Sequence, residues 1–218
     1  MKYFLQFGHF IVILLILLLV FIAVYRFDYL APKTYKASDF GIKTLKSKID
    51  KDKDGMDDYK DILMGARKFI SKNPKYKLKY YESGYPNDEY RTNTDILWYS
   101  LKNAGYNFKK MIDADIKKNS EEYNIDEIDS NMDFRRLKNI RVFLDKYTKK
   151  ITIDTEEIEK WQPGDIVIYK DDLAIISDKR NKEGIPYIIH HNNRIKYEEN
   201  TLTKNEIIGH YRFILANN

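Results

Sequence analysis

Residues 165–191, DIVIYKDDLAIISDKRNKEGIPYIIHH, contain three short apolar runs that are separated by turn-forming residues. The runs DIVIYK, LAIISD and IPYIIHH are rich in β-branched and aromatic residues, which favour strands, and NKEG has the composition of a turn. The stretch EIIGHYRFIL at residues 206–215 has the same character. The C-terminal part of the chain therefore predicts clustered antiparallel strands.

The preceding part of the chain has the longer apolar period of helices. DYKDILMGARKFISKN at residues 58–73 places apolar residues at a helical spacing, and DFRRLKNIRVFLDKY at 133–147 does so after a capping residue, Asp133. A further helix is expected from Thr94 to a glycine C-cap at Gly105, and a shorter one at 107–119. Helices followed by clustered strands predict an α+β domain.

Composition narrows the classes of function. The 218 residues carry 38 Lys and Arg against 33 Asp and Glu, and no basic stripe is interleaved with stacking aromatic residues. This pattern argues against nucleic-acid binding. The chain contains no cysteine, which excludes disulfides, zinc–thiolate sites and thiol catalysis.

The N-terminus contains an uninterrupted apolar run, FIVILLILLLVFIAVY, at residues 10–25. As a helix, residues 3–25 would cross a hydrocarbon core of about 30 Å. A cleaved signal peptide is the alternative, but no clean cleavage site follows the run. We therefore expect residues 1–27 to be a single-pass anchor in the cell membrane and residues 28–49 a tether, with the domain on the extracytoplasmic side.

Residues 50–61, DKDKDGMDDYKD, have the spacing of an EF-hand-like calcium loop, and the domain would follow at 62–218. Calcium takes 6–8 oxygen ligands, and an EF-hand draws them from loop positions 1, 3, 5, 7, 9 and 12 with glycine at 6. The alternative is a solvated acidic turn that caps the next helix. We expect a structural calcium ion, and the residues at the ligand positions are Asp50, Asp52, Asp54, Met56 (through its carbonyl), Asp58 and Asp61.

An ordered series of motifs carries a resemblance to a known family. It comprises ESGYPNDEYRTNTDILWYSLKNAGY, DSNMDFRRLKNIRVFLDKY, WQPGDIVIY, IISDKRNKEGIPYIIHHN and GHYRF, within residues 56–214. In these motifs the sequence resembles the domain-of-unknown-function 1287 family, which is related in fold to papain-like cell-wall peptidases and amidases of the NlpC type. The resemblance implies a papain-like fold with N-terminal helices packed on an antiparallel sheet.

The resemblance also implies three catalytic positions: a cysteine at a helix N-terminus, a histidine at a strand start and an orienting group on the next strand. A helix N-terminus and an imidazole activate the thiol, and the third group fixes the imidazole tautomer. These positions fall on Asn93, Asp172 and His190. Because an amide is not a nucleophile and Asp172 replaces the histidine, the expected cysteine chemistry is absent.

We therefore expect a catalytically inactive domain whose cleft, formed by Asn93, Thr94, Asp95, Asp172 and His190, binds a peptidoglycan peptide or an envelope protein. The alternative is an active amidase or peptidase with non-cysteine catalytic groups. Thr94 offers a hydroxyl, but one helical residue turns its side chain by about 100° from the cysteine direction. His190 also has a structural alternative, a strand-end histidine satisfied by a backbone carbonyl.

Overall fold

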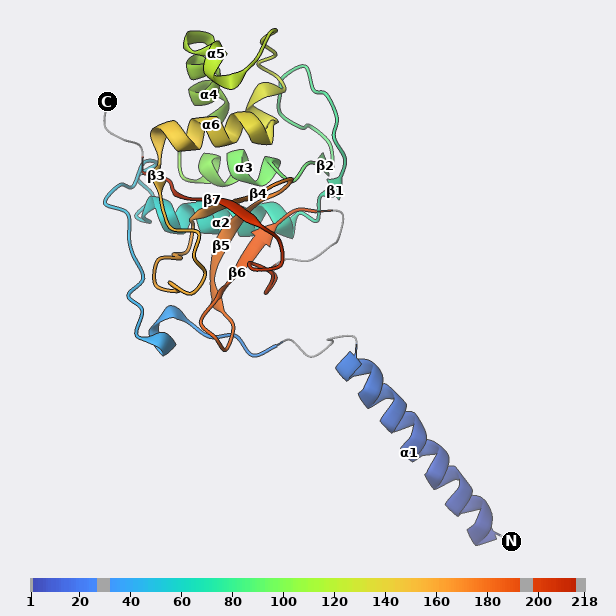
Figure 1. Cartoon of the computed structure of the whole chain (residues 1–218). Helices are drawn as coiled ribbons and strands as arrows, with labels where there is room; N and C mark the ends of the chain where they lie inside the picture. Colours follow the sequence, from blue (N-terminus) through green and yellow to red (C-terminus); the bar gives the residue numbers. More distant parts are fainter. Residues whose placement is uncertain (1, 27–31, 193–197, 215–218) are drawn as a thin grey trace. The chain divides into compact units, whose positions relative to one another are not determined.

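The structure is a computed structural model that describes residues 2–26, 32–192 and 198–214 (Figure 1). The chain forms two units, residues 1–34 and residues 35–218, and each is described by itself. The boundary expected at residue 27 lies outside the described residues.

Among its described residues, the first unit contains the helix α1 (Lys2–Arg26), which includes the apolar run. Its large apolar side chains from Phe10 to Ile22 are exposed. Within the described ranges, no helix combines the length and the apolarity that crossing a membrane requires. The anchor expected at residues 3–25 stays a prediction.

The second unit is built on a five-stranded antiparallel sheet in the order β3-β7-β4-β5-β6. Its strands are β3 (Lys149–Lys150), β4 (Ile166–Tyr169), β5 (Leu173–Arg180), β6 (Pro186–His190) and β7 (Ile207–Arg212). The runs that predicted strands coincide with β4, β5, β6 and β7. An antiparallel sheet in an α+β domain is thereby confirmed.

Both faces of the sheet are covered, and β4 shows this residue by residue. Ile166 and Ile168 belong to the core beneath the helices, whereas Val167 and Tyr169 belong to a smaller core with Trp161. Successive side chains of a strand point to opposite faces, so a strand buried on both faces needs apolar residues at every position. This explains why the sequence of β4 is continuously apolar.

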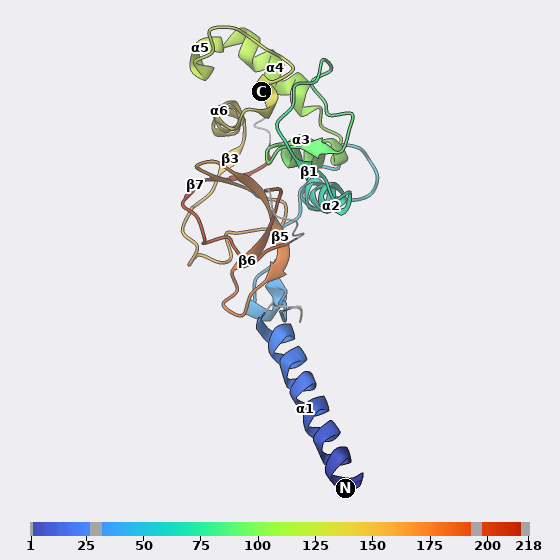
Figure 2. The ribbon, with the colours of Figure 1, turned by 90° about the vertical axis from the view of Figure 1, so that its right-hand side faces the viewer.

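Helices α2 (Asp58–Ser71) and α3 (Asp95–Asn103) pack against each other and against β5 (Figures 1 and 2). The remaining helices are α4 (Phe108–Lys118), α5 (Ser120–Tyr123) and α6 (Leu137–Tyr147). Helix α6 begins after Arg136, because residues 133–135 form a short 3-10 turn, η2 (Asp133–Arg135). Asp133 does not cap α6 as expected; its carboxylate accepts the Asp129 amide at 2.8 Å.

Two connecting segments are more ordered than the sequence predicted. The irregular region between α2 and α3 contains a two-stranded parallel pair, β1 (Lys75–Tyr76) and β2 (Tyr90–Arg91). The expected tether, 28–49, belongs to the second unit from Tyr35 onward. Tyr35 exchanges two backbone hydrogen bonds with Arg180, and a 3-10 turn follows, η1 (Ala37–Phe40).

Candidate functional site

Asn93 lies immediately before the N-terminal turn of α3 and is half-buried. Its Nδ2 donates to the carbonyl of Asp171 at 2.7 Å, and its Oδ1 accepts the backbone amide of Thr94 at 3.0 Å. The amide therefore connects the start of α3 to the turn that enters β5. This connection is made by both ends of the side chain.

Asp172 and His190 form the centre of the site. They lie near the paired ends of β5 and β6, where His190 is opposite Ala174. Asp172 Oδ2 is 2.9 Å from His190 Nδ1, and its Oδ1 accepts the amide of Leu173 at 2.8 Å. A carboxylate only accepts hydrogen bonds, so Nδ1 carries the ring proton.

The electrostatic environment of His190 contains opposing effects. Burial lowers its pKa, but the hydrogen bond to Asp172 and the charges of Asp172 and Glu199 outweigh burial, so its pKa is raised above the usual value of 6.5. Glu199 Oε2 lies 3.6 Å from Nε2. The imidazole thus lies between two carboxylates that favour its protonated form.

Glu199 has no signal in the sequence that would have identified it. It follows β6 in the chain and is held beside it by an antiparallel bridge to Ile188, with both backbone hydrogen bonds at 2.9 Å. The position depends on long-range pairing rather than on any local motif. Of the three charged groups at this centre, Asp172 and His190 were therefore predictable from the sequence and Glu199 was not.

A cavity of about 380 Å³ opens beside this centre. Within the described part of the chain, the buried atoms His190 Nε2 and Thr201 Oγ1 have no hydrogen-bond partner, and both residues line the cavity. Each of these two residues therefore carries a buried polar atom that no described group satisfies, and the group facing Nε2 is Glu199, at 3.6 Å. The described residues that line the cavity are Tyr169, Asp172, Ile188, His190, Asn192, Glu199, Thr201, Lys204 and Asn205.

The structure brings the three expected family positions into one neighbourhood. Asp172 and His190 are in direct contact, whereas Asn93 contacts the main chain one residue before Asp172. The tip of a helix and the ends of two adjacent strands therefore meet here, although Asn93 is not part of the cavity lining.

Thr94 and Asp95, which were expected in the cleft, are buried in the protein. Thr94 is 4% exposed and its hydroxyl donates to the carbonyl of Arg135 at 2.7 Å. Asp95 is fully buried and accepts four hydrogen bonds, from Thr92 N, Trp98 Nε1 and two nitrogens of Arg135. Because the polar atoms of both side chains are hydrogen-bonded to other protein groups, these residues stabilise the N-terminal end of α3 rather than line the cleft.

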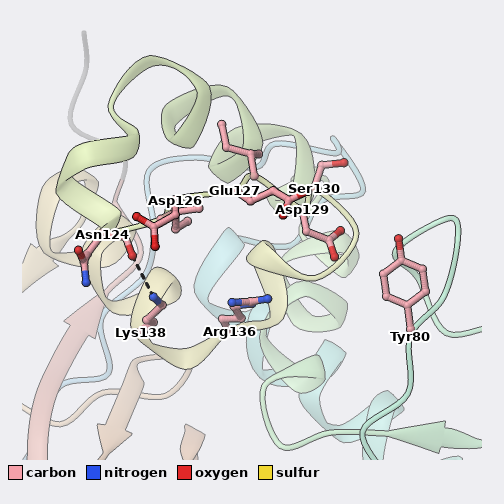
Figure 3. A pocket seen from close by; sticks show the side chains of 10 residues that line it. Tyr80, Asn124, Asp126, Glu127, Asp129, Ser130, Arg136 and Lys138 are labelled. Atoms are coloured by element: carbon pink, nitrogen blue, oxygen red, sulfur yellow. Dashed lines mark hydrogen bonds between the residues drawn. The ribbon is translucent and has the colours of Figure 1, made fainter.

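A second, larger cavity of about 740 Å³ lies on the loop that follows α5 (Figure 3). Acidic groups of the loop, including Asp126 and Glu127, face Arg136 and Lys138 across it, and Lys138 donates to the carbonyl of Asn124 at 3.3 Å. None of the three family positions lines this cavity. It carries no candidate chemistry comparable with the centre at His190.

The acidic loop gathers three of its predicted calcium ligands. One carboxylate oxygen from each of Asp50, Asp52 and Asp54 lies within 4.8 Å of the others. Met56 is half-buried beside them, and its amide donates to Asp54 Oδ1 at 2.8 Å. These residues are the first part of the ligand set that the sequence predicted.

The last two predicted ligands, on α2, differ from each other. Both carboxylate oxygens of Asp58 are engaged, by the amide of Lys51 and the hydroxyl of Tyr106. Asp61 is 1% exposed, and neither of its carboxylate oxygens has a hydrogen-bond partner among the described residues. Burial, followed by the charges of nearby aspartates led by Asp54, raises the pKa of Asp61 to about 6.

Comparison with known proteins identifies the family of this chain. The model of the family described as a domain of unknown function (DUF1287) matches residues 63–213. The chain belongs to the DUF1287 family. The three candidate positions lie inside the region matched by the DUF1287 model, whereas the acidic loop precedes it.

A distant relative matches most of the chain. The uncharacterized protein YijF of Escherichia coli (strain K12) is 27% identical over 167 residues, which cover 71% of this chain and 81% of the relative. No solved structure gives a significant match.

Proposed function

We propose that this DUF1287 domain has a papain-like fold of the NlpC type, has lost cysteine catalysis, and binds a peptidoglycan peptide at the cell envelope. The geometry supports the relationship, because Asn93, Asp172 and His190 occupy a helix tip and two adjacent strand ends. In the NlpC type, these places hold the nucleophile, the base and the orienting group.

The observation that carries the proposal is the hydrogen bonding of the Asn93 carboxamide. A carboxamide stands where the thiol would be, and its two polar atoms are hydrogen-bonded to the Asp171 carbonyl and the Thr94 amide. The neighbouring imidazole, on His190, is paired with a carboxylate rather than with a nucleophile. Activation of a nucleophile requires an ionisable or hydroxyl group in contact with the base.

The chemistry of the cavity favours a peptide as the ligand. Lys204 provides a cation for a peptide carboxylate, and Asp172 and Glu199 provide anions for an ammonium group. Protonated His190 also has an N–H at Nε2, which has no hydrogen-bond partner among the described residues and is the proposed donor to a peptide carbonyl. A pocket with a few convergent polar groups is the usual form of a small-ligand site.

The location is proposed from the N-terminus. The apolar run at residues 3–25 supports a single-pass anchor that holds the domain outside the cell membrane. Sedimentation of the full chain with membranes after alkaline extraction is the expected result. Release into the supernatant would remove this part of the proposal.

The test uses the full chain in detergent micelles with purified peptidoglycan peptides. Calorimetry should detect binding, and mass spectrometry should detect no cleavage. Asp172→Asn and His190→Gln should each weaken binding about tenfold, a loss of about 1.4 kcal/mol. Asp126→Asn, in the other cavity, is the matched control and should bind as the unaltered protein does.

Two results would overturn the proposal. Cleavage of an amide bond that Asp172→Ala abolishes would show that turnover is retained. Absence of peptide binding, together with capture of an envelope protein that the same variants weaken, would replace the peptide by a protein partner.

A second candidate function is hydrolysis with a relocated nucleophile. One observation favours it: Thr201 and His190 line the same cavity, and neither Thr201 Oγ1 nor His190 Nε2 has a hydrogen-bond partner among the described residues. An imidazole activates a hydroxyl only within hydrogen-bond reach, so this function requires Thr201 Oγ1 to approach Nε2 when the substrate binds. A covalent adduct of an active-site phosphonate probe on Thr201, lost in Thr201→Val, would favour this function.

A further inference from the structure

The acidic loop at residues 50–61 lies outside the region matched by the DUF1287 model, and the proposed function does not use it. Three of its carboxylates, from Asp50, Asp52 and Asp54, converge within 4.8 Å. Exposed acidic groups often gather in this way without a ligand. The convergence alone therefore assigns nothing.

Asp61 supplies an independent observation. This residue lies in the first turn of α2, its side chain is buried, and neither carboxylate oxygen is hydrogen-bonded within the described residues. Besides burial, the charges of Asp54, Asp52, Asp58 and Asp50 raise its pKa, so the acidic loop is close enough to act on this carboxylate. A buried carboxylate without a donor is costly unless a cation compensates it.

We propose that Asp50, Asp52, Asp54 and Asp61 bind a calcium ion, with Asp61 as the ligand that closes the site from α2. The donors are all oxygen atoms, which suits a hard divalent cation. The carbonyl of Met56 is the additional main-chain ligand at the seventh position of the loop. Asp58 is not a direct ligand, because Lys51 and Tyr106 already occupy its carboxylate.

The acidic loop contacts the end of α3, so an ion bound in the loop would affect how these segments are held together. A Cβ atom built on Gly105 would lie 3.0 Å from Cβ of Asp52 and 3.1 Å from its backbone nitrogen, so the loop rests on the turn after α3. Asn103, also at the end of α3, donates to the backbone carbonyl of Asp61 at 2.9 Å. An ion between the loop and Asp61 therefore joins the segment before the domain to α2 and α3.

The experiment measures thermal unfolding of the full chain in detergent micelles, with a chelator, with calcium and with magnesium. Calcium at about a hundred times its Kd should raise Tm by about 5 to 10 °C, since binding to the folded state alone shifts the equilibrium. Magnesium at the same concentration should have a much smaller effect, because it demands near-ideal octahedral geometry.

Asp61→Asn gives the sharpest readout, because its effect should change sign. In chelator, it should leave Tm unchanged or raise it, since it removes an uncompensated buried charge. In calcium, it should lower Tm relative to the unaltered protein and abolish the calcium shift. Asp54→Asn, on the exposed side of the loop, should reduce the shift without altering the core, and Asp126→Asn should preserve it.

Three outcomes would overturn the inference. These are an unaltered protein whose Tm is the same in millimolar calcium and in chelator, an equal shift with magnesium, and a full calcium shift in Asp61→Asn. Should Asp61→Asn fail to fold, Asp54→Asn decides the question by the same calcium shift. Peptide binding is measured separately, so failure here leaves the proposed function standing.

Discussion

The buried ion pair between Asp95 and Arg135 permits a quantitative prediction about what holds the candidate site together. Both side chains are fully buried, and Arg135 donates to Asp95 at 2.7 and 2.8 Å. Asp95→Asn would leave a buried guanidinium without a counterion, and Arg135→Met would leave a buried carboxylate. Removal of one partner of a buried pair costs about 3–5 kcal/mol.

The two substitutions should be strongly non-additive. The sum of the single costs is about 8 kcal/mol if each is near the middle of that range. The double variant contains no uncompensated charge, so we expect it to lose about 3 kcal/mol less than the sum. Urea unfolding followed by tryptophan fluorescence measures the cycle, since Trp98 donates to Asp95.

A control separates this effect from surface electrostatics. Lys75 and Glu89 form an exposed pair at 3.2 Å, with side chains 64% and 52% exposed. Glu89→Gln should therefore change the free energy of unfolding by less than about 1 kcal/mol. Additivity of the Asp95 and Arg135 variants to within about 0.5 kcal/mol would refute the reasoning, because independent sites behave in that way.

Three further predictions concern the site and its support. In an NMR titration, the pKa of His190 should exceed 6.5 and should be lower in Asp172→Asn. The stability that this pair contributes is fully present below pH 6.5 and is lost as the pH rises through the folded-state pKa. An unchanged pKa in that variant would contradict the assigned pairing. Since the chain lacks cysteine, Asn93→Cys creates a single thiol. Adding Asp172→His should increase the rate of alkylation of this thiol several-fold at neutral pH, because the imidazole favours the thiolate. Equal rates in the single and double variants would show that the two side chains do not interact. Gly164→Ala should lower the free energy of unfolding by more than about 3 kcal/mol. The reason is that the new Cβ would lie 2.3 Å from the carbonyl oxygen of Tyr59, at a backbone φ of +86°. A loss below about 1 kcal/mol in urea unfolding would be inconsistent with that contact.

The sheet could be predicted because its strands are local patterns. Val167 and Ile168 point to different cores, yet both are apolar, so a short β-branched run was enough to place β4. The parallel pair β1–β2 could not be predicted, because Lys75 and Tyr90 are joined by pairing across a segment rich in turn residues. Its two-residue strands have no periodicity to detect.

The candidate site was predictable in its positions but not in its contacts. The family motifs placed Asn93, Asp172 and His190, which the fold brings to one neighbourhood. They did not show that the Asp95 side chain is buried in an ion pair with Arg135. That pair joins residues 40 positions apart and depends on the contact between η2 and the start of α3. Glu199 was not predicted for the same reason, because the backbone bridge to Ile188 of β6 is what brings it close to His190.

The bridge between Ile188 and Glu199 also matters for solubility. An unprotected outer strand offers free amide and carbonyl groups to a neighbouring molecule and promotes ordered aggregation. One border of this sheet, β3, consists of two exposed lysines, whose charges repel a second copy. The opposite border, β6, is covered in part by the segment that carries Glu199. Variants that displace this segment to study ligand binding should therefore be checked for self-association, because they also uncover a surface suited to intermolecular strand pairing.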